Sequence, residues 1–596
     1  VWVRSRREAR PEPFERTTCG GWPWTRGTST APGRSPTLST ALAEAMNEGT
    51  AARPLLQVEN LRTVFHTDAG EVHAVRGASF SVGRGKTLCI VGESGCGKSV
   101  AARSILNLVQ HPGVIEDGAV WFDGPRGRVD LASLDPYGAQ MRAVRGDDIA
   151  MIFQEPMSAL SPVHTIGHQI IEMLQLHRTV SKREARDRAI DLLERVRMPE
   201  PASRLGAYTF ELSGGMRQRA MIAMALACDP ALLIADEPTT ALDVTTQATI
   251  LELLRDLQRA NDMSLILITH DLGVVAEMAD DVAVMYLGTV VESGPVADVF
   301  ADPQHPYTQG LLGSMPRIDP ERAFARYAIP GTVPPATLRD EGCPFAARCA
   351  VAIEGHCTVV EPLLHEVTVA HAARCHLADP ERAEGAPSRI SEGANVAAES
   401  RPAEKERDAA GVALEVASLH VEYPVYGGML QRRVGTVQAV ENVSFTLARG
   451  ETVGLVGESG SGKTSLAHAL VRLHAPSQGR VTLHGEDGSV LDVVHARRED
   501  LKRLHRSVRM VFQDPYGSLD PRLPVRDVIG EPIDLLTDAS VEERNAKVDA
   551  LLATVGLSAD VAARYVHAFS GGQRQRIGIA RALATDPDVL IADEPV

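Results

Sequence analysis

The chain has 596 residues, of which 44% are apolar, and its formal charge at pH 7 is −16. A length of this order predicts several domains, and the acidic balance argues against a nucleic acid as the main partner. No run approaches the roughly eighteen apolar residues that a membrane-spanning helix needs, so we expect any membrane part to come from other chains.

The first residues differ from the rest of the chain. Residues 1–45 mix Arg, Pro, Gly, Ser and Thr without periodicity, and they hold three of the four tryptophans. We expect residues 1–54 to be a disordered tail, and we expect the natural start of the protein to be Met46. A basic targeting segment is the alternative.

A glycine-rich octapeptide lies between an apolar run at 88–91 and a helical pattern at 100–106. Its form, G-x-x-x-x-G-K-[ST] between a strand and a helix, is typical of a phosphate-binding loop whose backbone N–H groups face an anion. We expect Lys98 to reach the β- and γ-phosphates and Ser99 to ligate Mg²⁺. A glycine turn with a surface lysine is the alternative, which the flanking pattern disfavours. The loop consists of Gly92, Glu93, Ser94, Gly95, Cys96, Gly97, Lys98 and Ser99.

The same loop occurs a second time, after the apolar run at 453–456. A repeat at so large a separation predicts a duplicated domain rather than a solenoid. The second loop consists of Gly457, Glu458, Ser459, Gly460, Ser461, Gly462, Lys463 and Thr464.

Apolar runs that end in polar residues predict parallel strands whose carboxyl ends meet at one edge of a sheet. The run at 231–235 ends in Asp236 and Glu237, and the run at 265–269 ends in His270. Short apolar runs alternate with helical patterns from residue 55 onward, which predicts an α/β fold. Asp593 and Glu594 repeat the first pair at the end of the chain, so we expect the second domain to be incomplete.

A second glycine motif precedes each Asp-Glu pair by the same interval. We expect each motif to place serine and glycine N–H groups at a helix N-terminus, with the helices running over 219–226 and 576–583. The two motifs are Ser213, Gly214 and Gly215 in the first half and Ser570, Gly571 and Gly572 in the second.

Together with Gln154 and Gln513, which follow apolar runs, these motifs occur in an order that resembles the nucleotide-binding subunits of ABC transporters. The resemblance covers about residues 55–596 and implies two P-loop NTPase domains in tandem. The segments 305–308 and 512–522 resemble the dipeptide/oligopeptide importer branch. A chain of this kind is expected to bind ATP and Mg²⁺.

The resemblance implies a role for each polar residue. Asp236 would hold Mg²⁺ together with Ser99 and Gln154, and Glu237 would orient and deprotonate the attacking water. His270 would contact the γ-phosphate, and Asp243 would cross to the opposite half. The second-half counterparts are Lys463, Thr464, Gln513, Asp593 and Glu594, with Thr464, Gln513 and Asp593 at Mg²⁺; the sequence holds no counterpart of His270.

The resemblance also implies how the halves cooperate. Each ATP would lie between the phosphate loop of one half and the serine-glycine motif of the other. The partners would be two integral-membrane permease subunits and an extracytoplasmic solute-binding protein, with no nucleic acid. The chain would lie at the cytoplasmic face of the membrane and contact it through the permeases only.

Two aromatic residues precede the phosphate loops at the place where this family often stacks a ring on adenine. They are Phe65 and Tyr423. An ordinary core aromatic at a strand end is the alternative interpretation.

Four of the eight cysteines fall within 33 positions, and five, seven and seventeen residues separate them. No Cys-x-x-Cys pair is present, and four thiolates suit either zinc or a [4Fe–4S] cluster. The resemblance to oligopeptide-importer ATPases implies the iron–sulfur cluster; unliganded thiols are a further alternative. The four are Cys343, Cys349, Cys357 and Cys375.

The most favoured function is ATP hydrolysis that energises import of dipeptides or oligopeptides, with glutathione or nickel complexes as alternative cargo. A soluble ABC protein of DNA repair or translation would favour basic surfaces or long inserted arms, and a non-catalytic scaffold would not need Glu237. The expected division of the chain is a first ATPase domain at 55–287, a cysteine-containing extension at 288–378, a flexible linker at 379–411 and a second ATPase domain at 412–596.

Overall fold

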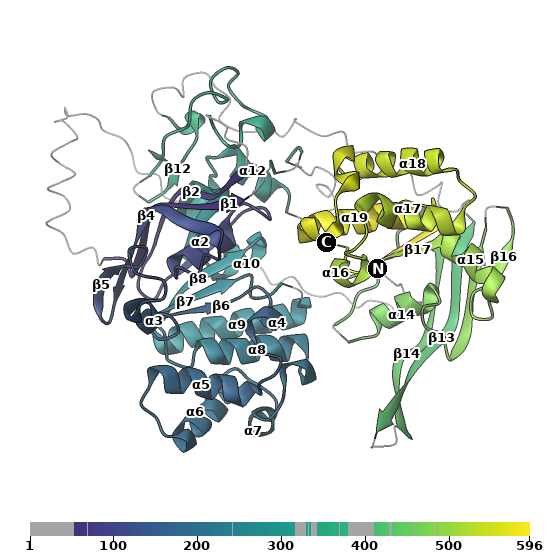
Figure 1. Cartoon of the computed structure of the whole chain (residues 1–596), viewed down its shortest axis with the longest axis horizontal. Helices are drawn as coiled ribbons and strands as arrows, with labels where there is room; N and C mark the ends of the chain where they lie inside the picture. The colour runs from purple at the N-terminus through teal and green to yellow at the C-terminus, as the bar shows by residue number, and fades with distance from the viewer. Residues whose placement is uncertain are drawn as a thin grey trace, which may run out of the picture.

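The computed structural model describes residues 53–67, 70–240, 242–315, 329–331, 333–334, 342–368, 370–379, 411–427, 432–458, 460–485 and 487–595. The two halves of the sequence form two lobes, coloured purple to teal and green to yellow in Figure 1. The expected tail falls on residues outside this description, except for its last two, and so does most of the expected linker.

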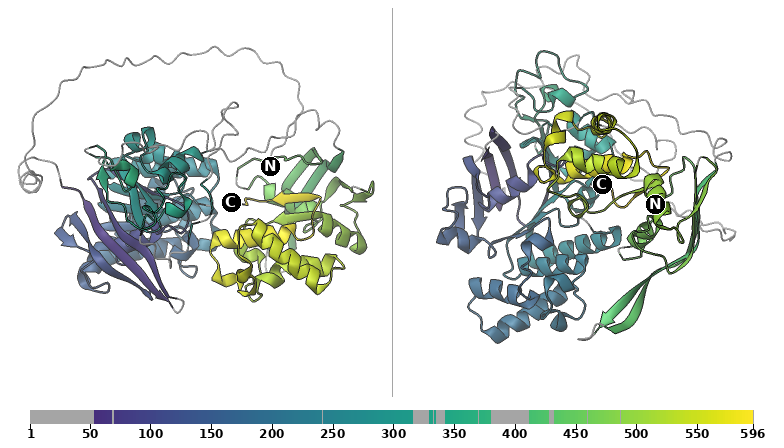
Figure 2. Two further views of the ribbon diagram at one scale, coloured as in Figure 1. Left: turned by 90° about the horizontal axis from the view of Figure 1, so that it is seen from above. Right: turned by 45° about the vertical axis from the view of Figure 1, so that its right-hand side comes forward.

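Each lobe contains an antiparallel sheet of four strands. In the first lobe the order is β2-β1-β4-β5, and in the second it is β14-β13-β15-β16. The first set is β1 (Leu56–Thr67), β2 (Gly70–Val82), β4 (Gly113–Gly124) and β5 (Gly127–Asp130). The second set is β13 (Val412–Gly427), β14 (Arg432–Ala448), β15 (Gln478–His484) and β16 (Val490–Asp492). β13 and β14 form a long two-stranded ribbon, visible in Figure 2.

The first lobe also has an eight-stranded central sheet in the order β11-β12-β10-β9-β3-β8-β7-β6. The strands from β9 to β6 are parallel, and their apolar runs are buried on both faces, as such sheets require. The parallel strands are β3 (Thr87–Val91), β6 (Ile149–Ile152), β7 (Leu232–Asp236), β8 (Ser264–Thr269) and β9 (Asp281–Tyr286). The predicted α/β fold is therefore confirmed, with the polar residues at the carboxyl ends of β3, β7 and β8.

Helices cover this sheet and form a separate helical layer below it in Figure 1. Arg126 and Arg178 pair with the buried Asp147 between the two layers. The helices that carry or follow motifs are α2 (Lys98–Ile105), α8 (Gly214–Ala225), α9 (Val244–Asn261) and α10 (Leu272–Met278). The others are α3 (Ala139–Val144), α4 (Pro156–Ala159), α5 (Ile166–His177), α6 (Lys182–Arg195), α7 (Pro201–Arg204) and η1 (Thr209–Glu211).

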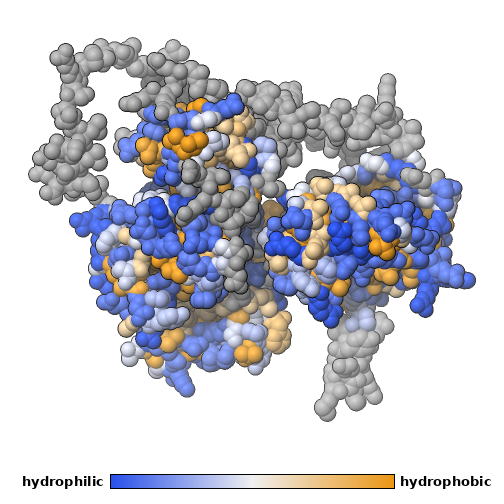
Figure 3. Space-filling view, turned by 45° about the horizontal axis from the view of Figure 1, so that its top comes forward, coloured by the Kyte–Doolittle hydropathy of each residue, from blue (hydrophilic) through white to orange (hydrophobic). Residues whose placement is uncertain are grey.

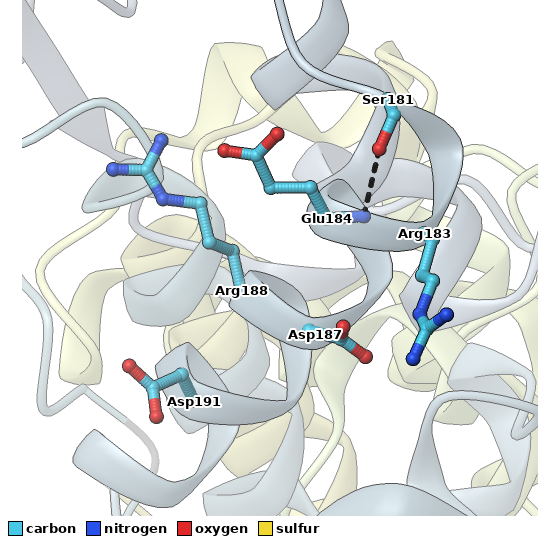
Figure 4. A pocket seen from close by; sticks show the side chains of 6 residues that line it. All are labelled: Ser181, Arg183, Glu184, Asp187, Arg188 and Asp191. Atoms are coloured by element: carbon cyan, nitrogen blue, oxygen red, sulfur yellow. Dashed lines mark hydrogen bonds between the residues drawn. The ribbon is translucent and has the colours of Figure 1, made fainter.

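The outer face of α6 is charged, and a shallow hollow on it is lined by alternating acidic and basic side chains (Figure 4). Ser181 caps this helix by accepting a hydrogen bond from the Glu184 N–H at 3.2 Å. The alternation of charge is typical of a solvated helix face, and we assign no site to it.

The extension continues the central sheet of the first lobe. β10 (Thr289–Pro295) pairs with β9, and β12 (Ala372–Ala373) joins β10 to β11 (His365–Glu366). Its helices are α11 (Val296–Ala301), α12 (Pro306–Gly313), η2 (Ala346–Arg348) and η3 (His376–Ala378). Tyr307 and Phe345 belong to the same hydrophobic cluster as the central sheet, so the extension shares the core of the first lobe.

The second lobe repeats the helical layer but only part of the central sheet. β17 (Val508–Val511) and β18 (Val589–Ala592) pair in parallel, as β6 and β7 do. Its helices are α14 (Lys463–Leu470), α15 (Arg498–Ser507), α16 (Pro515–Ser518), α17 (Val525–Leu536), α18 (Val541–Thr554), η4 (Ala559–Ala563), η5 (Val566–Ala568) and α19 (Gly571–Leu583).

The apolar run at 453–456 forms no strand. Its first-lobe counterpart β3 lies between β8 and β9, both of which follow the Asp-Glu pair in sequence. In the part of the second lobe that the structure describes, no strand pairs with 453–456. Val456 is consequently 74% exposed, whereas Val91 on β3 is 1% exposed.

The absence of this strand divides the second core. In the first lobe one hydrophobic cluster joins the sheet to the helical layer, but in the second lobe the sheet and the helices form separate clusters. Figure 3 shows apolar side chains, in orange, scattered among polar ones on the visible faces of both lobes. No helix among the described residues is long and apolar enough to cross a membrane.

Candidate functional site

The first phosphate loop is shaped by its lysine and by close backbone approaches. Lys98 is 5% exposed, and its Nζ donates to the carbonyl oxygens of Gly92 at 2.6 Å and Glu93 at 3.0 Å. Gly97 has a φ of 98°, and a Cβ there would lie 2.2 Å from the Ala74 carbonyl oxygen, so only glycine fits. Because α2 begins at Lys98, the N–H groups of its first turn are available to an anion.

Ser99 and Asp236 meet beside this loop. The Ser99 hydroxyl donates to Asp236 Oδ1 at 2.9 Å, and Asp236 is fully buried at the end of β7. Its Oδ2 is buried without a hydrogen-bond partner. Burial raises the pKa of Asp236, and the bond from Ser99 opposes that change. An unpartnered carboxylate oxygen beside a hydroxyl fits Mg²⁺, a cation that prefers oxygen ligands, and binding it would satisfy the orphaned atom.

Three side chains surround the carboxylate of Glu237. Gln154 Nε2 donates to Oε2 at 3.0 Å, the Thr240 hydroxyl donates to Oε2 at 2.9 Å, and His270 Nδ1 lies 3.6 Å from Oε1. Burial raises the pKa of Glu237, but the hydrogen bonds from His270 and Thr240 outweigh it and hold the pKa below its usual value. The predicted base therefore stays ionised at neutral pH and can accept a proton.

The sequence analysis did not identify Thr240. It follows Glu237 by three residues, and a hydroxyl at that spacing after a catalytic carboxylate is the signal that could have indicated it. Glu237 has a φ of 47°, so the chain turns sharply at this point and brings Thr240 back to the carboxylate.

The second loop repeats the local geometry of the first. Lys463 Nζ donates to the carbonyl oxygens of Gly457 at 2.7 Å and Glu458 at 2.8 Å. Gly462 has a φ of 90° and approaches the Ala439 carbonyl oxygen as closely as Gly97 approaches Ala74. Thr464 follows Lys463 in the first turn of α14. Ser459 lies outside the described residues.

The second Asp-Glu pair is also placed as the first is. Gln513 Nε2 donates to Glu594 Oε2 at 2.5 Å, and Glu594 has a φ of 46°. Asp593 is buried, and its Oδ2 has no hydrogen-bond partner. Both halves therefore bring together a loop lysine, a buried aspartate and a glutamate held by a glutamine.

The serine-glycine motifs open helices, as predicted, but the helices begin earlier than predicted. α8 begins at Gly214 rather than 219, and α19 begins at Gly571 rather than 576. Ser213 and Ser570 cap them by accepting from the N–H groups of Met216 and Gln573, and these caps allow the earlier start. Among the described residues, no atom lies within 4 Å of a Cβ built on Gly571 or Gly572, so this end of α19 is open.

The remaining predicted contacts are not tested by this geometry. Asp243 caps α9 by accepting from the Thr246 N–H at 3.0 Å, which is a contact within its own half. Phe65 lies against Gly113 on the neighbouring strand, and Tyr423 packs edge-on against His474 with ring centroids 5.3 Å apart. Adenine stacking and composite sites between the halves stay predictions.

The four clustered cysteines line one cavity of about 10 Å³, together with His305 and Phe345. A cavity of this size holds about one water. Burial raises the pKa of Cys343 to about 12 and that of Cys375 to about 11, so these thiols are neutral. Within the part of the chain described, no group of three or more His, Cys, Asp or Glu side chains could hold a metal ion. The cysteines converge, but this arrangement does not support the iron–sulfur or zinc expectation.

Comparison with known proteins gives two family matches. Residues 75–240 and 440–596 match the family described as ABC transporter, and residues 291–357 match the family described as oligopeptide/dipeptide transporter, C-terminal region. The chain is 44% identical over 548 residues to the oligopeptide transport ATP-binding protein OppD of Mycobacterium bovis, with 91% of this chain and 86% of that protein covered. It is also 44% identical over 546 residues to the glutathione import ATP-binding protein GsiA of Pectobacterium atrosepticum, with 91% and 77% covered.

Proposed function

The chain belongs to the ABC transporter family of ATPases, and we propose that it hydrolyses ATP to drive import of peptides or of peptide-like solutes such as glutathione. One observation carries the ATPase part: Lys98, the Ser99–Asp236 pair and the ionised Glu237 lie at one edge of the central sheet. The cargo class is supported by the relatives' names and by the match of residues 291–357 to an oligopeptide/dipeptide transporter region.

In the proposed reaction, the loop N–H groups and Lys98 hold the phosphates of ATP. Glu237 accepts a proton from a water whose oxygen bonds to the γ-phosphorus, while the bond from that phosphorus to the β-phosphate oxygen breaks and ADP leaves. Ser99 and Asp236 would hold Mg²⁺, which neutralises charge on the phosphates. Gln154 and Thr240 hold the Glu237 carboxylate in one orientation, so the proton acceptor does not need to reorganise.

The proposed partners are two permease subunits and an extracytoplasmic solute-binding protein, with the chain at the cytoplasmic face of the membrane. A hollow of about 890 Å³ supports a permease contact on the first lobe. It lies between the end of α2 and the segment around Phe153, so a permease segment bound there would contact the residue next to Gln154, which holds Glu237. Its lining includes Arg103, Leu108, Val109, Ile115 and Phe153.

The test of this function uses the full chain, purified with and without its permeases. Hydrolysis that depends on Glu237, and uptake of a labelled peptide into vesicles that depends on hydrolysis, are the expected results. Competition by glutathione and by nickel complexes distinguishes the alternative cargoes. Hydrolysis that the permeases never alter, together with no fractionation to membranes that contain them, would favour a soluble ABC ATPase.

We propose separately that the thiols lining the four-cysteine cavity take up an iron–sulfur cluster or zinc after a rearrangement. Four soft donors line one cavity, although among the described residues no three such side chains are placed to hold a metal ion. Because the cavity holds about one water, uptake of a cluster would require it to widen. Anaerobically purified protein with broad absorbance near ~400 nm and roughly four irons per chain would support a cubane. Colourless protein with stoichiometric zinc would indicate zinc, and four thiols that alkylate without any bound metal would remove the proposal.

A further inference from the structure

We propose that Arg348 is a positioning residue for the first phosphate loop, through which the cysteine-bearing extension holds that loop in its ATP-binding shape. The proposal rests on the function above, because it concerns how the same loop binds ATP. It follows from contacts between residues that lie 255 positions apart in the sequence.

Arg348 forms a salt bridge with the carboxylate of Glu93, the second residue of the loop. Its Nη1 donates to Oε2 at 2.6 Å and its Nη2 donates to Oε1 at 3.0 Å, so the pair is bidentate. The side chain of Arg348 is 5% exposed and that of Glu93 is 30% exposed. A forked pair with one partner buried fixes both the position and the orientation of the carboxylate.

The extension also holds the backbone of Glu93. The N–H of Glu93 donates to the hydroxyl of Tyr307 at 2.8 Å, while its carbonyl oxygen accepts from Lys98. The same carbonyl oxygen accepts from the Cys96 N–H at 3.3 Å, so every polar group of Glu93 has a partner, and two of the four partner residues come from the extension. Because Lys98 bonds the same residue, the position of Glu93 determines where the phosphate-binding lysine rests.

Arg348 is itself fixed from within the extension. Its Nε donates to the Pro330 carbonyl oxygen at 2.8 Å, and its guanidinium lies 5.8 Å from the ring centroid of Tyr286. Phe345 packs against the rings of Tyr286 and Tyr307, with centroids 5.2 Å and 5.3 Å away. Phe345 also lines the four-cysteine cavity, and Cys349 follows Arg348 directly. A change in that cavity would therefore move the residues that hold the loop.

The pair has an electrostatic effect as well. Glu93 places a negative charge beside the site of a polyanionic ligand, and Arg348 neutralises it. In the second loop the matching Glu458 is exposed to solvent, where water screens its charge.

The experiment measures ATP dissociation constants by titration of the full chain in a Lys463→Ala background, which limits binding to the first loop. We expect Arg348→Gln to raise the Kd for ATP roughly tenfold, since it removes charge-assisted hydrogen bonds and leaves Glu93 unpaired. Arg348→Lys keeps the charge but loses the fork, and we expect roughly a threefold rise. In steady-state hydrolysis, KM should rise by a similar factor while kcat changes less than about twofold.

The variant Glu93→Gln provides the rescue. If Arg348 acts through Glu93, the double variant Glu93→Gln with Arg348→Gln should bind ATP within about threefold of the parent, because the unpaired charge is gone.

Two outcomes would overturn the proposal: an unchanged Kd in folded Arg348→Gln, or an additive effect in the double variant. Should Arg348→Gln fail to fold, the Kd of Arg348→Lys decides, and an unchanged value overturns the proposal. Failure of the proposed function is distinguishable, because in that case the Lys463→Ala parent would itself show no ATP binding that Lys98→Ala abolishes.

Discussion

The two phosphate loops have nearly the same residues and the same lysine contacts, but the rest of the chain covers them differently. The first follows a strand that lies between two others, and its Glu93 is held by Arg348. The second follows a segment that forms no strand, and its Glu458 is exposed. The loop residues therefore determine the local turn in both halves, whereas elements later in the sequence determine how firmly that turn is held.

A similar contrast applies to the predicted catalytic carboxylates. Glu237 has partners from Gln154, Thr240 and His270, whereas among the described residues Gln513 holds Glu594. Matched substitutions in the two halves test this contrast.

The largest effect is expected from Glu237→Gln. Loss of the proton acceptor should slow single-turnover hydrolysis about 10²–10⁴-fold, while ATP binding persists because the phosphate loop is intact. Rapid-quench measurement of ATP cleavage, alongside nucleotide titration, checks both parts. The matched change Glu594→Gln should have a smaller effect, since among the described residues its carboxylate is held by Gln513 and not by three side chains. An equal loss in the two variants would mean that the halves are functionally equivalent, and an unchanged rate in Glu237→Gln would refute the assignment of the base.

The next effect concerns stability. Val91→Glu places a charge on a strand that is buried on both faces, and we expect it to cost about 3–5 kcal/mol of unfolding free energy. Val456→Glu is the matched change at an exposed position and should cost at most about 0.5 kcal/mol. Urea titration followed by circular dichroism measures both. A comparable loss from Val456→Glu would show that residues 453–456 are buried in solution.

These comparisons also indicate what the sequence could predict. The phosphate loops and the strand-terminal carboxylates are local patterns, and each was found where the pattern placed it, whereas the two capped helices begin five residues earlier than predicted. The apolar run at 453–456 forms no strand, because strand formation depends on neighbours supplied by other parts of the chain. The contact of Arg348 was not predicted, because nothing in the local sequence indicates a partner 255 residues earlier.

A third prediction compares the loop lysines. Lys98→Ala should raise the Kd of the first loop for ATP about tenfold to a hundredfold, since it removes a charged donor from a nearly buried site. Lys463→Ala should raise the Kd of the second loop by a smaller factor, because Lys463 is less buried and water competes for the same contacts. Titrations of each single variant, with the double variant as the blank, separate the two sites. A larger effect of Lys463→Ala than of Lys98→Ala would mean that ATP binding depends more on the lysine of the second loop than on that of the first.

The smallest expected effect is a pH dependence of the free energy of unfolding, which arises from the His270–Glu237 pair in the first half. Glu237 raises the pKa of His270 above the usual 6.5, so the pair stabilises the fold fully below that value and loses its contribution as pH rises through the raised pKa. Glu237 has a lowered pKa, so its own contribution is present above 4.5 and is lost only as pH falls through the lowered value. Both groups are therefore charged at pH 6, and only Glu237 is charged at pH 9.

The side chain of His270 is 63% exposed, so solvent screens the pair. We expect His270→Ala to cost about 0.5 kcal/mol at pH 6 and nothing measurable at pH 9, by urea unfolding at each pH. In a Glu237→Gln background the same substitution should show no difference between the two pH values, because its charged partner is absent. An equal cost at pH 6 and pH 9 would mean that His270 contributes by packing, and the ion pair would then have no part in the stability of the first half.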